Sequence, residues 1–414
     1  MTDFQAKPED LFGAGNLATD LAQTMHGVID LARAPQGFDY KSSGGAYSFK
    51  GLIATVHFDE AVSEFSKQMA ARLTSRGDDL DDIGYQLKRA AWRYTSQDRS
   101  TADSIADQHA HIDSRDGRTN YNVDPLANAT PFPSGDKPDV KVPDDKKADF
   151  RDLIDQTQGN ILKFDKVVRQ ATGWIDKHIL GGDGKGWDPV EKLLAPIIGN
   201  WDELERAGEC FRKAGTASEA LAGTLKKADG QLDHGWQGKA AAAYQDHGQR
   251  LARAMEWEGP LGRIAEVVLK KTSQQIQKVG KELLDHINDE LVNMFVGKHW
   301  WDKLKNVIED AIPVAKIADV AYRMWKLYQH AEDIYNKMKK LLEDAKAILA
   351  VLQNPVGAIG DLGKKYGTFD SDSADGDKNK VDISADITRA SDVSAITQAP
   401  PDKYAAPTGG AAWE

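Results

Sequence analysis

The sequence has almost no cysteine: Cys210 is the only one in 414 residues. A single thiol excludes an internal disulfide framework, so the fold depends on a non-covalent core. Cys210 falls on the apolar side of a helical pattern. We therefore expect a small buried core residue there and not a nucleophile.

The sequence also lacks an excess of positive charge. Its formal net charge is −11, with acidic and basic residues mixed along the chain. This balance disfavours nucleic acid and anionic membranes as main partners, because both attract basic surfaces. No stretch of about 18 apolar residues occurs, so we expect no transmembrane helix. The polar, acidic N-terminal residues do not resemble a secretory signal peptide. We expect a cytosolic protein, or one that leaves the cell by a route that recognises a folded signal.

Strand patterns are missing too, whereas helical periodicity is strong. Apolar residues recur at spacings of three and four over about 14–33 and 58–106, which predicts an antiparallel helical hairpin. A second hairpin is predicted over about 198–287, with its turn at "DHGWQG" and a kink at Gly259-Pro260. The expected fold class is all-α, with long antiparallel helical hairpins packing as a helical bundle.

Composition divides the chain into five parts. We expect an N-terminal helical hairpin over 1–111, a flexible linker over 112–147, a second helical hairpin over 148–298, a C-terminal helical region over 299–366, and a disordered acidic tail over 367–414. The linker and the tail are poor in apolar residues, and so have little burial to offset the entropy of ordering.

Three short stretches contain residues typical of metal, phosphate or calcium sites but lack the other features that such sites require. His109, His111 and Asp113 lie where a helix enters the linker, and we expect a solvated segment there. The glycine-rich stretch 181–186 follows no strand and precedes no Lys-Ser/Thr pair, so it is not a phosphate loop. The acidic stretch 370–377 does not have the spacing of a calcium loop. We therefore expect no catalytic residue, no metal site, no cofactor and no enzymatic activity.

Two short motifs remain. Trp236 and Gly238 form a Trp-x-Gly motif in the turn of the second hairpin. Tyr94 and Asp98 place a phenol and a carboxylate four residues apart, on one face near the end of the first hairpin. Trp236 either is buried and fixes its turn or presents its indole at the surface. Its polar and glycine neighbours favour an exposed indole.

These motifs carry a resemblance to the substrates of type VII (ESX) secretion. The stretch 198–287, "IIGNWDELERAGECF…", resembles a WXG100-type hairpin, with Trp236 and Gly238 at that family's turn motif. The stretch "FDEAVSEFSKQMAARL…RYTSQDRSTAD" is similar to the C-terminal arm of the small ESX-1-associated excreted proteins, with Tyr94 and Asp98 at their export motif. The order of the two hairpins is similar to a fused PE–PPE arrangement.

The resemblance implies that the two motifs meet at one end of a helical bundle and form a composite export signal. It also implies that the secretion ATPase or a chaperone recognises Trp236, Gly238, Tyr94 and Asp98. A second Tyr-x-x-x-Asp, Tyr366 and Asp370, lies where the tail begins, and we rank it second as an export motif.

We therefore expect a non-enzymatic protein that is cytoplasmic before export and then secreted or placed at the cell surface by type VII secretion. A small WXG100 protein or a second copy of the chain is a further expected partner; nucleic acid is not. One alternative is a carrier or adaptor of a WXG-type toxin system. Another is an oligomerising or weakly membrane-active secreted structural protein, in which Trp300, Trp301 and Trp325 face lipid or a neighbouring subunit.

Overall fold

The computed structural model describes residues 7–41, 51–97, 111–112, 119–120, 129–145, 149–163, 165–186, 188–295, 314–356, 358–373, 383–400 and 404. Its α-helices are α1 (Pro8–Arg33), α2 (Leu52–Thr55), α3 (Phe58–Gln97), α5 (Asp149–Lys163), α6 (Asp165–Ile175), α7 (Pro189–Leu194), α8 (Trp201–Leu232), α9 (Lys239–Phe295), α11 (Val314–Gln353), α12 (Leu362–Ser373), α13 (Ser384–Ser391) and α14 (Ser394–Thr397). Short helical turns are η1 (Ala34–Gly37), the π-helical η3 (Asp176–Leu180) and η4 (Ile359–Asp361). The two-residue strands β1 (His111–Ile112) and β2 (Thr119–Asn120) pair antiparallel. The predicted all-α class is confirmed.

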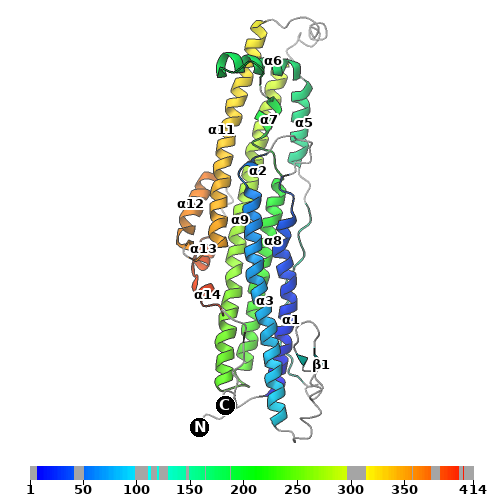
Figure 1. Ribbon diagram of the computed structural model, residues 1–414, viewed down its shortest axis with the longest axis vertical. Helices are drawn as coiled ribbons and strands as arrows, with labels where there is room; N and C mark the ends of the chain where they lie inside the picture. Colours follow the sequence, from blue (N-terminus) through cyan, green and yellow to red (C-terminus); the bar gives the residue numbers. More distant parts are fainter. Residues whose placement is uncertain are drawn as a thin grey trace.

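Two long hairpins pack side by side along most of the molecule (Figure 1). Helices α1 and α3 form one hairpin, and α8 and α9 form the other. Helix α9 continues far beyond α8, and α11 returns beside that extension together with α5 and α6. The two hairpins thus pair with each other within one chain, and their buried apolar residues belong to one connected core.

The apolar stripes of the hairpins form this core, as the periodicity predicts. Leu73 of α3 and Leu204 of α8 are fully buried, and the Phe65 ring of α3 meets the Phe211 ring of α8 edge-on at 4.8 Å. Cys210 is buried and its pKa is raised to about 12 by burial, so it is a core residue as expected. Asp188 caps α7 by accepting from the backbone N–H groups of Val190 and Glu191.

Glycines let α8 and α9 approach closely. A Cβ at Gly215 would lie 2.5 Å from the Glu258 carbonyl oxygen, and one at Gly262 would lie 2.2 Å from that of Phe211. Only glycine allows backbones this near each other. Helix α9 runs through Pro260 without a break, so Pro260 does not end the helix.

The expected flexible linker over 112–147 is ordered in its described second half. Residues 129–145 form neither helix nor strand and lie against α1 and α8. The Thr130 N–H donates to the Glu9 carbonyl at 3.1 Å, Arg206 donates to the Pro143 carbonyl at 2.8 Å, and Lys213 pairs with Asp139 at 2.8 Å. The helices thus supply hydrogen-bonding and ion-pair partners to this part of the linker, whose backbone has few partners of its own.

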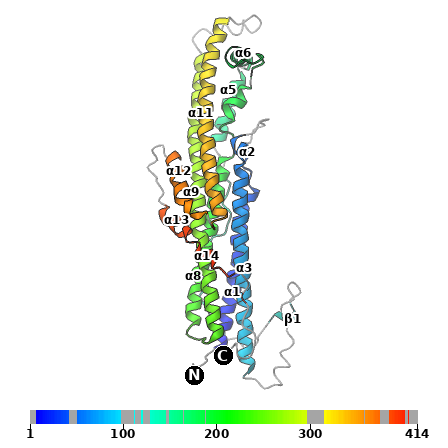
Figure 2. The same ribbon diagram turned by 60° about the vertical axis from the view of Figure 1, so that its left-hand side comes forward.

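The tail expected to be disordered from residue 367 also has packed structure. Helix α12 continues to Ser373, and α13 and α14 lie beside α9 (Figure 2). The Trp257 indole N–H donates to the Ala390 carbonyl at 3.0 Å, and Tyr404 is buried. Low apolar content predicts disorder only if the chain has no surface to pack on, and α9 supplies one.

Candidate functional site at one end of the bundle

The Trp-x-Gly motif forms the turn between α8 and α9. The N–H groups of Gly235 and Trp236 donate to the Leu232 carbonyl at 2.9 and 3.0 Å, which closes the end of α8. Gly238 has a φ of +114°, in the region that favours glycine, and its carbonyl accepts from the Ala242 N–H in the first turn of α9. Gly238 therefore turns the chain back into the second arm.

Trp236 is buried, with 2% of its surface exposed, so the expectation of an exposed indole is wrong. Its sequence neighbours Asp233, His234 and Gln237 are exposed, as their polarity predicts. The turn directs the indole inward, where its ring centre lies 5.7 Å from that of Tyr244 on α9. Polar neighbours in sequence say little about a turn residue, because successive side chains of a turn point in different directions.

Tyr94 of α3 lies at the same end of the bundle and meets Trp236 across the two hairpins. Its side chain is buried, and burial raises the pKa of its hydroxyl, while the Trp236 indole N–H acts in the opposite direction. The indole N–H faces this hydroxyl without forming a hydrogen bond of ordinary geometry to any described residue. Two of the residues singled out in the sequence are thus brought together by the packing of α3 against the second hairpin.

A buried carboxyl lies next to this pair. The Tyr244 hydroxyl donates to Asp229 Oδ1 at 2.5 Å, linking α9 to α8. Burial raises the pKa of Asp229 to about 6, against a smaller lowering by the bond from Tyr244. The pKa of Tyr244 is raised well above its usual value by burial and by the nearby Asp229. In the folded chain the tyrosine therefore keeps its proton, and the carboxyl takes up a proton of its own as the pH falls through about 6.

A second polar link joins α3 to α9. His247 Nε2 lies 2.8 Å from Asp79 Oδ1, and both side chains are buried. The Tyr404 N–H also donates to Asp79 Oδ1, at 3.3 Å. The Tyr404 ring stands edge-on to Tyr244 and His247, at centroid distances of 6.0 and 5.2 Å.

We use the name end cluster for these residues: Asp79, Tyr94, Asp229, Trp236, Tyr244, His247 and Tyr404. They come from α3, α8, the α8–α9 turn, α9 and the C-terminal segment. The α8–α9 turn lies toward the lower end of the molecule in Figure 1. Sequence reasoning identified only Trp236 and Tyr94 among them. Tyr244 and His247 do continue the apolar stripe of the second hairpin, a signal of burial that carries no hint of polar pairing.

The other predicted site residues lie elsewhere. Asp98 lies outside the described residues. Tyr366 is buried on α12, and Asp370 forms an ion pair with Lys271 of α9, whose ammonium lies 5.7 Å from the Tyr366 ring centre. This second Tyr-x-x-x-Asp is therefore part of the contact that holds α12 on α9, far from the end cluster (Figure 1).

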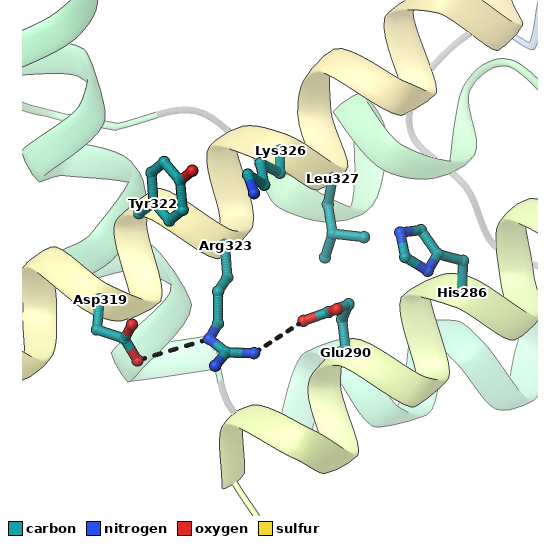
Figure 3. Close-up of a pocket in the computed structure, with 7 residues that line it drawn as sticks. All are labelled: His286, Glu290, Asp319, Tyr322, Arg323, Lys326 and Leu327. Carbon is teal, nitrogen blue, oxygen red and sulfur yellow. Dashed lines mark hydrogen bonds and ion pairs between the residues drawn. The ribbon is translucent and has the colours of Figure 1, made fainter.

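A pocket of about 420 Å³ lies at the opposite end of the molecule, between α9 and α11. Figure 3 shows Arg323 between two carboxylates, 3.2 Å from Glu290 and 3.5 Å from Asp319. Lys326 lies over the ring of Tyr322, at 4.6 Å from its centre. Arg323 is already paired on both sides, so it offers little to an anionic ligand.

The described part of the chain contains no group of three or more His, Cys, Asp or Glu side chains that could hold a metal ion. His111 lies in β1, whereas His109 and Asp113 lie outside the described residues. None of the described helices combines the length and apolarity needed to cross a membrane.

Of the three tryptophans expected to face lipid or a neighbouring subunit in one alternative, only Trp325 lies in the described part of the chain. Trp325 is partly buried against the core and stacks on Tyr328, with ring centres 5.4 Å apart. Packing within the chain accounts for it. Trp300 and Trp301 lie outside the described residues.

Comparison with protein families, with curated proteins and with solved structures finds no match to this chain.

Proposed function

We propose that this chain is a non-enzymatic substrate of a type VII secretion system, and that its end cluster contains the export signal. The observation that supports the proposal is the meeting of Trp236 and Tyr94 at one end of the two paired hairpins. The resemblance in sequence implies such a composite signal. The position of Tyr94 on α3 and of Trp236 in the α8–α9 turn is the geometry that a composite signal needs.

The pairing of the two hairpins within one chain also affects whether the protein needs a separate WXG100 partner. A lone hairpin of two helices leaves an apolar face that needs a second hairpin to cover it. Here α1 and α3 cover α8 and α9, so the chain supplies both halves itself. We therefore propose that the protein is exported without a separate WXG100 partner, and that the secretion ATPase or a chaperone recognises the end cluster directly.

The test is export from a host that has a type VII system, compared with the same host lacking the secretion ATPase. Tyr94→Phe and Trp236→Phe keep an aromatic ring in the core while removing the phenol hydroxyl or the indole N–H. Asp98→Asn removes only a charge. We expect each variant to accumulate in the cell and to be depleted from the culture filtrate on immunoblots.

Matched controls separate recognition from folding. Tyr322→Phe makes the same chemical change as Tyr94→Phe at a tyrosine that is 57% exposed, and Tyr366→Phe makes it in the second Tyr-x-x-x-Asp. Both should be exported like the wild type, and all variants should keep its circular dichroism spectrum. Equal export with and without the ATPase would refute the proposed route. Normal export of all three motif variants, Tyr94→Phe, Trp236→Phe and Asp98→Asn, would refute the proposed signal.

A further inference from the structure

The C-terminal segment, residues 383–400 with Tyr404, follows α9 to the end cluster. Helices α13 and α14 lie beside α9 in both views (Figures 1 and 2). Polar contacts hold α13 there: Arg263 pairs with Asp386 at 2.9 Å, and Arg389 pairs with Glu219 of α8 at 2.8 Å. The segment is therefore docked on the second hairpin over its described length.

Tyr404 completes the end cluster. Its side chain is 6% exposed and lies against Tyr244 and His247, and its backbone N–H bonds to Asp79. The Tyr94 hydroxyl lies near enough that its negative charge, if ionised, would raise the pKa of Tyr404, which burial already raises. Tyr404 thus lies near Tyr94 and against Tyr244, the α9 ring that contacts Trp236.

The contacts of the C-terminal segment are of a kind that can be reversed. The Tyr404 hydroxyl is buried without a hydrogen bond to any described residue, which makes its burial less favourable. Arg389 is 53% exposed, and ion pairs exposed to solvent contribute little to stability. The core of the hairpins does not depend on this segment, because α8 and α9 bury most of their apolar stripe against each other and against α1 and α3.

We propose that the C-terminal segment is an intramolecular cover of the rest of the end cluster, and that its release exposes Tyr94 and Trp236 to the export receptor. This inference rests on the proposed function, since it assigns a regulation to the same site. In the covered state both motif residues are buried, so a receptor cannot contact them fully until Tyr404 leaves. The cover acts by competition: the receptor and Tyr404 use the same surface of α3 and α9.

Hydrogen–deuterium exchange of the full-length protein tests the cover without a receptor. In Tyr404→Ala we expect about tenfold faster exchange in residues 229–248 and 79–94, which Tyr404 covers. Local opening of these residues then no longer has to break the contacts of the Tyr404 ring. Exchange in α11 should stay unchanged. Tyr404→Phe keeps the ring and removes the unpaired hydroxyl, so it should exchange no faster than the wild type. Tyr322→Ala, an exposed tyrosine at the opposite end, is the matched control.

Unchanged exchange in Tyr404→Ala would overturn the cover, and so would equally fast exchange in Tyr404→Phe. Export of the same variants then tests the regulation. Tyr404→Ala should be exported faster than the wild type, and Tyr404→Phe should not. Faster exchange in Tyr404→Ala together with unchanged export would overturn the proposed regulation but would not contradict the proposed export signal. Export that does not depend on the secretion ATPase would instead overturn the proposed function, whatever the exchange data show.

Discussion

Replacing Trp236 by alanine tests whether the indole in the α8–α9 turn is part of the core. The side chain is 2% exposed, and a buried Trp removes roughly 200 Å² from water, which at about 25 cal/mol per Å² corresponds to about 5 kcal/mol. Alanine retains a small part of this, and the site can partly collapse. We therefore expect Trp236→Ala to lower the free energy of unfolding by about 3–5 kcal/mol.

The companion variant Trp236→Phe separates ring packing from polar pairing. The indole N–H forms no hydrogen bond of ordinary geometry to a described residue, so its removal should cost little. Phenylalanine keeps the contact with Tyr244, and we expect a loss of about 1 kcal/mol, typical of a modest change in core volume. Both losses are measured by urea unfolding followed by circular dichroism at 222 nm, with the midpoint and slope fitted separately.

Tyr322→Ala is the control, because that side chain is 57% exposed and should change stability by less than about 0.5 kcal/mol. A loss below about 1 kcal/mol for Trp236→Ala would refute the burial of the indole and restore the exposed position that its sequence neighbours suggest. A large loss for Trp236→Phe, equal to that of alanine, would instead show that the indole N–H has a partner of its own.

Three further predictions concern other parts of the fold. Asp229 has a pKa of about 6 in the folded chain, above its ordinary value of 3.8. Its contribution to stability is therefore complete below pH 3.8 and lost as the pH rises through 6. Asp229→Asn should gain up to about 3 kcal/mol relative to the wild type between pH 4 and pH 7 in urea unfolding, and a difference independent of pH would contradict this. Arg72→Ala leaves Glu258, which is 1% exposed and bonded to Arg72 at 2.6 Å, without that partner, and should cost about 3 kcal/mol in the same assay. A Cβ at Gly13 would lie 2.0 Å from the Thr130 carbonyl oxygen, so Gly13→Ala should displace residues 129–145 and speed their cleavage by a protease. At Gly159 an added Cβ would meet no neighbouring group of the described residues within 4 Å, so Gly159→Ala should leave cleavage unchanged.

The sequence alone determined the helical class and the lengths of the main helices. Apolar spacing predicted α3 and the α8–α9 hairpin because a helix stripe is a local pattern that repeats along one element. The turn that contains Gly238 followed from an equally local rule, since a positive φ depends on a few neighbouring residues. The sequence also singled out Trp236 and Tyr94 as a pair.

Only the tertiary structure decided what surrounds that pair. Aspartate usually lies at the surface, yet Asp79 of α3 and Asp229 of α8 are both buried, because α9 provides His247 and Tyr244 as their partners. Such pairing joins residues distant in sequence, and no local pattern predicts it. No local pattern predicts the packing of residues 129–145 and of the C-terminal segment either, because that packing too joins residues distant in sequence. Their own side chains cannot offset the entropy of ordering, whereas the grooves and charges of α1, α8 and α9 can.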